Sequence, residues 1–301
     1  NKKVSIEILN DEKLIAERMH LFHAVGRSAK TKPRLIILKY HGDDESNLFS
    51  HCILGKGLVF DNGGVNLKPT GYVEDMFVDK HGACDSLAVY ESVVKMNLKI
   101  NIICALAVAE NAIDSESYKP SDIITSRKGL TVEIGNTDAE GRLCLADSLT
   151  YIQDKYMPKT IIDLATLTGA CMVALGNNTA GIFGNNKDLI NSLIDSGSDV
   201  NELIWELPIT RDHRKSISNS TIADLTNSAK GDRFGGASQA AAFLEAFIDE
   251  NTNWAHIDIA GPSVKGGIAT GFGAQTILNY LIKSIEKKEQ IETTEVPNKL
   301  I

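Results

Sequence analysis

The chain has 301 residues, and its 31 Lys and Arg residues against 39 Asp and Glu residues give a formal net charge of −8 at pH 7. This negative balance argues against a dedicated nucleic-acid-binding protein, because binding phosphates requires a basic face. Hydrophobic residues make up 43% and charged residues 23% of the chain, an ordinary globular composition that excludes a disordered chain, a collagen-like rod or a coiled coil.

Short apolar runs alternate along the chain with segments of helical spacing. In chain order, the pattern predicts strands at residues 34–40 and 52–60, a helix at 83–94, a strand at 100–109, a helix at 143–149, a strand at 160–165, a helix at 241–247, a strand at 254–260 and a helix at 277–285. This alternation predicts an α/β fold, with a mixed, largely parallel central sheet flanked by helices on both faces in three layers.

No linker rich in Gly, Pro or Ser divides the chain, so we expect a single domain over residues 1–301. Residues 1–32 are predicted to form a lead-in segment, and the charged residues 287–301 a frayed tail. The longest apolar run, residues 102–108, is far shorter than the ~18 residues of a membrane-spanning helix, and no secretory signal is visible. Five widely spaced cysteines are typical of reduced thiols, so we expect a cytoplasmic protein.

The most informative motif is Asn-Thr-Asp-Ala-Glu-Gly-Arg at residues 136–142, directly before a predicted helix. If this segment is extended, its two-residue period points Asp138, Glu140 and Arg142 in the same direction. The small and apolar residues around them indicate a buried setting, in which unpaired carboxylates are costly and need a cation. A polar loop with an acidic helix start is the alternative interpretation.

A second cluster begins with the glycine-rich segment 55–64. It places Lys56 and Asp61 at the end of a predicted strand, where open α/β sheets have their ligand-binding crevices, and Lys68 and Asp79 follow. A nucleotide-binding loop is a rival interpretation, but the segment lacks the spacing of the phosphate-binding glycine motifs. Taken singly, Lys68 and Asp79 are also compatible with solvated surface charges.

Together these motifs resemble the leucine aminopeptidase (cytosol aminopeptidase) family of dinuclear metallopeptidases. The resemblance is carried by GKGLVFDNGG at residues 55–64, LKP at 67–69, MFVD at 76–79, NTDAEGRL at 136–143 and DLATLTGA at 163–170. It extends from about residue 25 to residue 282, and NTDAEGRL is highly specific to the family. The resemblance implies a three-layer peptidase catalytic domain.

The resemblance implies two divalent metal ions per subunit. Carried onto this chain, the tighter-binding ion has the ligands Lys56, Asp61, Asp79 and Glu140, and the more exchangeable ion has Asp61, Asp138 and Glu140. This oxygen-dominated set suits Zn²⁺ or Mn²⁺, and also Mg²⁺ or Co²⁺. An amine binds metal only when neutral, so we expect Lys56 to lose its charge only in the metal-bound protein.

The resemblance also implies roles in catalysis. Lys68 is expected to polarise the scissile carbonyl, and Arg142 to hold a bicarbonate ion that acts as the general base. The implied substrate-binding residues are Met76, Asn136, Thr166, Leu167 and Gly169. Core packing is an equally good interpretation of Met76 and Leu167. The expected reaction is hydrolysis by metal-activated water of an N-terminal residue, with a leucine-type preference, from peptides that have a free N-terminus.

Family members form homohexamers and carry a further N-terminal domain. We expect this chain to form a homohexamer, to lack that domain, and to bind neither membranes nor nucleic acid. The rival functions are a catalytically impaired relative with a structural or interaction role, and a different two-metal hydrolase such as a phosphoesterase. The phosphoesterase interpretation is weaker, because such a site would more naturally use His ligands.

The sequence departs from the family pattern beside Asp79, where Lys80 and His81 follow and Asp85 stands at a position that is usually apolar. We expect His81 to face solvent, with a contact near the metal centre as the alternative. His256 lies in a predicted strand and is expected to be a satisfied core residue.

Overall fold

The computed structural model describes residues 3–229 and 234–295. Its main sheet has eight strands in the order β1-β2-β4-β3-β7-β11-β8-β9. These strands are β1 (Val4–Leu9), β2 (Arg34–His41), β3 (His51–Asp61), β4 (Asn101–Asn111), β7 (Thr160–Ala165), β8 (Thr179–Gly184), β9 (Leu203–Glu206) and β11 (Asn253–Asp258). The central strands β4, β3, β7 and β11 run parallel, whereas β1, β2 and β8 join through antiparallel pairs. The predicted mixed sheet with a parallel centre is confirmed.

Two smaller sheets flank the main sheet. One has the order β10-β6-β5, and the other is the pair β12-β13. Their strands are β5 (Ile123–Thr125), β6 (Thr131–Glu133), β10 (Leu225–Thr226), β12 (Val264–Lys265) and β13 (Ile268–Ala269). The sequence pattern did not predict these five strands, because runs of two or three residues are too short to show a period.

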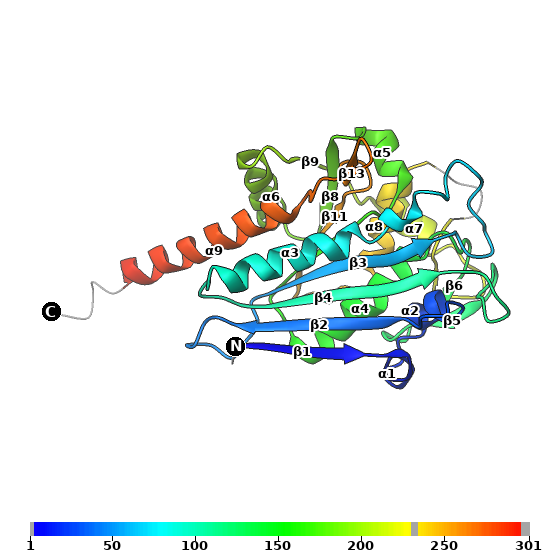
Figure 1. Cartoon of the computed structure of the whole chain (residues 1–301), viewed down its shortest axis with the longest axis horizontal. Coiled ribbons are helices and arrows are strands. Elements are labelled where there is room, and N and C mark those ends of the chain that lie inside the picture. The colour runs from blue at the N-terminus through cyan, green and yellow to red at the C-terminus, as the bar shows by residue number, and fades with distance from the viewer. Residues whose placement is uncertain (1–2, 230–233, 296–301) are drawn as a thin grey trace.

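Helices cover both faces of the main sheet, as predicted. They are α1 (Asp11–Ala16), α2 (His20–Gly26), α3 (His81–Lys95), α4 (Gly141–Tyr156), α5 (Gly169–Leu175), α6 (Lys187–Asp199), α7 (Arg211–Ile217), α8 (Gly236–Glu245), α9 (Ala274–Glu295) and the 3₁₀ helix η1 (Met76–Val78). Figure 1 shows α3 and α9 across one face, with α4 behind the sheet. Successive residues of β3 alternate between the two cores: Cys52 and Leu54 pack with α4, and Ile53 packs with α3.

Both ends of the described chain differ from the predictions. The predicted lead-in segment is part of the fold, because β1 pairs with β2 at the sheet edge and α2 buries Phe22 and Val25. At the other end, α9 continues to Glu295, so residues 287–295 are helical rather than frayed. Lys288 contributes to this extension, since its Nζ lies 3.2 Å from the Asp43 carboxylate. Residues 296–301 lie outside the described residues.

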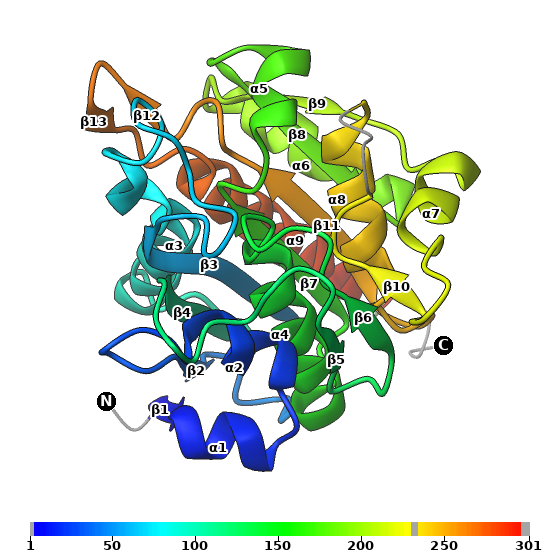
Figure 2. The ribbon, with the colours of Figure 1, turned by 90° about the vertical axis from the view of Figure 1, so that its right-hand side faces the viewer.

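The parallel centre brings the ends of distant segments to one edge of the sheet. In Figure 1 the arrowheads of β3 and β4 lie on the same side, and Figure 2 looks onto that side. Open α/β sheets bind ligands at this carboxyl edge. Within the described ranges, no helix is both long and apolar enough to cross a membrane.

Candidate metal centre

The predicted site residues lie where the parallel strands end. Asp61 is the last residue of β3, and Thr166 directly follows β7. Beyond Asp61 the chain turns at Gly63, whose φ of +89° favours glycine; a Cβ there would lie 2.5 Å from Asn66 O. The N–H of Lys68 then donates to Asn62 O at 2.9 Å. The turn therefore returns Lys68 to the end of the strand that carries Lys56 and Asp61.

Lys56 lies at the centre of the first half of the site. Its Nζ lies 2.8 Å from both carboxylate oxygens of Asp79 and 2.9 Å from Glu140 Oε1, and all three side chains are buried. The close approach depends on Gly141, because a Cβ at that position would lie 2.5 Å from Lys56 Cε. Two segments more than 60 residues apart in sequence thus meet at one ammonium group.

In the second half of the site, Lys68 connects two acids. Its Nζ lies 2.9 Å from Asp61 Oδ2 and 2.6 Å from Asp138 Oδ1. Asp61, Asp138 and Glu140 each offer a carboxylate oxygen, and these oxygens lie within 4.8 Å of one another. This spacing fits metal ions shared between carboxylates. The structure therefore brings the five predicted metal ligands and Lys68 into one cluster. We call this cluster the metal centre, and it consists of Lys56, Asp61, Lys68, Asp79, Asp138 and Glu140.

The electrostatics of the metal centre follow from burial and an excess of acids. Burial alone would lower the pKa of Lys56, but the carboxylates of Asp79, Glu140 and Asp61 outweigh it and raise that pKa. Burial, reinforced by repulsion from Asp61, raises the pKa of Glu140. Among the residues that the structure describes, four carboxylates face two lysine ammonium groups here. The cluster therefore favours additional positive charge.

The segment that carries Asp138, Glu140 and Arg142 is not extended, so this part of the sequence interpretation is wrong. Ala139 N donates to Asn136 O in a turn, Glu140 has helical backbone angles (φ −78°, ψ −38°), and α4 begins at Gly141. The acids converge because of this turn and helix start, and not because of a strand period.

Arg142 is buried next to the metal centre. Its Nη1 donates to the backbone carbonyl of Asn227 at 2.6 Å. Its Nε is buried and, within the described part of the chain, has no hydrogen-bond partner. Burial lowers the pKa of Arg142 to about 10, although Glu140 and Asp258 oppose this shift. A buried guanidinium with an unused donor is suited to a small oxyanion.

The predicted substrate-binding residues differ in their contacts with this cluster. Thr166 contacts it directly, because its carbonyl accepts from Lys56 Nζ at 2.9 Å and its Oγ1 donates to Asp79 at 2.7 Å. Asn136 orients the loop through its Oδ1, which accepts from the N–H of Asp138 at 2.9 Å. Gly169 is exposed at the start of α5. Met76 is half-buried in η1, and Leu167 packs partly against the core, as the alternative interpretation of Leu167 allowed.

Two residues of the site, Asn111 and Asp258, were not predicted as site residues. Asn111 Nδ2 donates to Asp61 Oδ1 at 2.8 Å and so orients that carboxylate. Asp258 accepts from Leu167 N at 3.1 Å and Thr168 Oγ1 at 2.7 Å, which fixes the loop after β7. Both are polar residues at the ends of apolar strands, and this position at the carboxyl edge is the signal that could have identified them.

The predictions for His81 and His256 have different outcomes. His81 is buried, with its Nδ1 against Val78 O, so the solvent-facing prediction is wrong; its place at the start of α3 turns it inward. Asp85 is also buried, and burial together with Glu202 raises its pKa to about 7. The predicted core position of His256 is confirmed, but its predicted full satisfaction is not. Its Nδ1 lies 2.5 Å from Asp163 Oδ1, while its Nε2 has no hydrogen-bond partner among the described residues.

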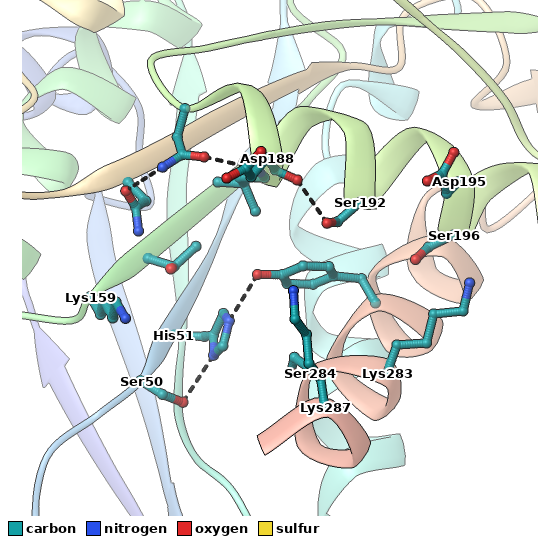
Figure 3. Close-up of a pocket in the computed structure, with 15 residues that line it drawn as sticks. Ser50, His51, Lys159, Asp188, Ser192, Asp195, Ser196, Lys283, Ser284 and Lys287 are labelled. Atoms are coloured by element: carbon teal, nitrogen blue, oxygen red, sulfur yellow. Dashed lines mark hydrogen bonds between the residues drawn. The ribbon is translucent and has the colours of Figure 1, made fainter. Parts of the chain in front are cut away.

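A cavity of about 470 Å³ lies at the opposite, amino edge of the sheet. Figure 3 shows it between the start of β3 at His51 and the helices α6 and α9. Its lining mixes the lysines 159, 283 and 287 with the aspartates 188 and 195, and burial lowers the pKa of His51 to about 4. None of the predicted site residues lies there, so this cavity is separate from the metal centre.

Similarity to known proteins is informative about the site at the carboxyl edge. The family model described as "Cytosol aminopeptidase family, catalytic domain" matches residues 1–278. A probable cytosol aminopeptidase from Xanthomonas campestris pv. campestris (strain B100) is 43% identical over 283 residues, which is 93% of this chain and 56% of that protein. One from Xylella fastidiosa (strain 9a5c) is 43% identical over 279 residues, 92% of this chain and 55% of that protein. The chain thus spans just over half the length of these relatives.

A solved structure has a similar fold. Leucyl aminopeptidase from Leishmania major in complex with actinonin superposes with a TM-score of 0.88 at 29% sequence identity. The match covers 92% of this chain and 54% of that protein.

Proposed function

The chain belongs to the cytosol aminopeptidase family, and from this premise we propose that it forms the dinuclear catalytic domain of a leucyl aminopeptidase. The reaction is the hydrolysis of the N-terminal residue from peptides. The observation that carries the proposal is the convergence of Lys56, Asp79 and Glu140 with Asp61 and Asp138 in one buried, acid-rich cluster.

The side chains fit two divalent cations. The acids outnumber the lysines that face them, and the carboxylates of Asp61 and Glu140 are close enough to be shared. Lys56, Asp61, Asp79 and Glu140 would hold one ion, and Asp61, Asp138 and Glu140 the other. Carboxylate ligands without imidazole suit Zn²⁺, Mn²⁺, Mg²⁺ or Co²⁺. When bound, such ions act as Lewis acids and lower the pKa of water. Lys56 must lose a proton to become a ligand, so metal binding releases protons.

Lys68 and Arg142 supply the remaining chemistry. Lys68 is partly exposed and lies between Asp61 and Asp138, where its ammonium group can reach a substrate carbonyl and stabilise the negative charge that develops on it. The Nε of the buried Arg142, which has no partner among the described residues, supports a bound bicarbonate ion as the proton acceptor. Such an ion would replace the His or Glu base that many hydrolases use.

Specificity for the free N-terminus follows from the proposed metal ions. A free substrate α-amine would bind one of them as a neutral ligand, whereas the amide nitrogen of an internal peptide bond is neither basic nor free to ligate. Thr166 and Asn136 contact the cluster or the loop that carries it, and together with Met76, Leu167 and Gly169 we propose them as the substrate-binding residues. Homohexamer formation, a single catalytic domain over residues 1–301 and a cytoplasmic location complete the proposal.

The proposal is tested by release of a reporter amide from leucyl, methionyl and N-acetyl-leucyl substrates, with and without Mn²⁺ or Zn²⁺. We expect metal-dependent hydrolysis of the two free-amine substrates and none of the blocked one. Hydrolysis of N-acetyl-leucyl reporter would contradict anchoring by the amine. Metal binding without any hydrolysis would instead favour the catalytically impaired relative, and cleavage of phosphate esters the phosphoesterase.

A further inference from the structure

Asn227 is a fully buried residue outside the motifs that identify the family. It directly follows β10, which pairs in parallel with β6, and its N–H donates to Glu133 O at 3.1 Å. This pairing sets Asn227 beside the loop that follows β6 and carries Asp138, although Asn136 and Asn227 are 91 residues apart in sequence. The small sheet β10-β6-β5 thus brings Asn227 to the metal centre.

The side-chain amide of Asn227 makes four hydrogen bonds to this loop. Its Oδ1 accepts from the N–H groups of Gly135 at 2.8 Å and Asn136 at 3.2 Å. Its Nδ2 donates to the carbonyls of Asn136 at 2.7 Å and Ala139 at 3.2 Å. In a flipped amide, Nδ2 would face the two backbone N–H groups and Oδ1 would face the two carbonyls, so the orientation of the amide is fixed. The bonded residues come before and after Asp138 in the chain, and the four bonds use the full bonding capacity of the amide.

The backbone of Asn227 holds Arg142 at the same time. Its carbonyl accepts from Arg142 Nη1 at 2.6 Å, while Arg142 Nε is buried without a partner in the described structure. In a planar guanidinium, Nε–H and one N–H of Nη2 point in parallel. The contact at Nη1 therefore leaves this two-donor edge for an oxyanion.

We propose that Asn227 is a positioning residue of the metal centre. Its amide fixes the loop 135–139 so that Asp138 and Glu140 face the cations, and its carbonyl selects the edge of Arg142 that binds the anion. The inference rests on the proposed function, because it assigns Asn227 a purpose only if this cluster binds metal. Hydrogen-bonding partners of this kind typically change metal affinity by roughly 10- to 100-fold.

The test compares Asn227→Ala and Asn227→Asp with a matched control, Asn101→Ala. Asn101 is also buried and clamps a loop, accepting from Asp43 N and donating to the carbonyls of Ser46 and Leu48, but it lies at the amino edge. Two quantities are measured on the folded full chain: Mn²⁺ affinity by titration calorimetry, and amide hydrogen exchange of residues 134–140 in the metal-free protein.

We expect Asn227→Ala to bind Mn²⁺ roughly 10- to 100-fold more weakly and to exchange faster in the loop. Asn227→Asp keeps both acceptor contacts but loses both donor contacts, so its affinity should be intermediate. Asn101→Ala should lose thermal stability without losing Mn²⁺ affinity. Wild-type affinity or wild-type loop exchange in Asn227→Ala overturns the positioning role. A wild-type chain that binds no Mn²⁺ contradicts the proposed function instead, and the exchange rates then decide alone whether Asn227 orders the loop.

Discussion

The metal centre, at the carboxyl edge of the main sheet, and a second buried charged cluster within that sheet differ in how their charges are balanced. The second cluster, which we call the sheet-centre cluster, consists of Asp163, Trp254 and His256 on the neighbouring strands β7 and β11. All three side chains are buried. The two carboxylate oxygens of Asp163 are bonded by His256 Nδ1 at 2.5 Å and Trp254 Nε1 at 2.7 Å. One acid thus faces one base and one neutral donor.

The metal centre has no such balance within the described part of the chain, since four carboxylates share two lysine ammonium groups there. A buried acid with a full set of partners can serve the fold alone, whereas a surplus of buried acids is costly unless further cations bind. Burial by itself therefore does not identify a functional site. The charge left over after pairing is the feature on which we base the proposed site.

The largest effect is expected from Glu140→Ala, which removes a proposed shared ligand from the metal centre. Bound metal should fall from about two ions per chain to below one, and hydrolysis should become undetectable, because both ions lose a ligand. Elemental analysis of the purified protein measures the metal content. Full metal occupancy in this variant would show that Glu140 holds neither ion.

The contrasting variant is Asp163→Ala in the sheet-centre cluster. Removing one partner of a buried charged pair typically costs about 3–5 kcal/mol, because the other group is left uncompensated. The free energy of unfolding in urea should fall by that amount, while the metal content of the folded protein stays at the wild-type level. If Asp163→Ala lost its metal while remaining folded, the division between a structural and a functional cluster would be wrong.

A smaller and more selective effect is expected from Lys68→Ala. Lys68 is the lysine of the metal centre that we assign to the substrate rather than to a cation, so its removal should leave the metal content intact. Turnover should fall by roughly 10²- to 10³-fold, the usual effect of losing one donor to a developing oxyanion. Steady-state kinetics with a leucyl reporter measure the effect, and a rate equal to wild type would exclude Lys68 from the chemistry.

The sequence predicted the parallel centre of the fold well, because its strands are long and buried on both sides. The predicted bounds of 160–165 coincide with β7, and those of 52–60 fall one residue short of β3 at each end. The prediction for α8 was displaced: residues 241–247 were expected, and Gly236–Glu245 are helical. An alanine-rich helix gives a weak apolar period, which leaves its start undefined.

The site was predictable only where its residues stand in dense motifs. Lys56, Asp61 and Glu140 belong to such motifs, and the structure brings them together. Asn227 does not, because its position depends on pairing between β10 and β6, two strands of two and three residues. Local spacing carries no information about such long-range pairing. The burial of His81 was missed for a similar reason, since it depends on where α3 packs rather than on its neighbours in sequence.

The smallest expected effect is a pH dependence of stability from His256. Burial alone would lower its pKa, but the carboxylates of Asp163 and Asp258 outweigh burial and Arg142 and raise it above its ordinary value. The folded chain therefore holds this proton more tightly than the unfolded chain, so the stabilisation is fully present below pH about 6.5 and is lost as the pH rises through the raised pKa. The difference in unfolding free energy between wild type and His256→Gln isolates this contribution. It should be largest near pH about 6 and should decrease at higher pH; a difference that stays constant or grows would mean that His256 is neutral in the fold, and that the sheet-centre cluster is not a charged pair.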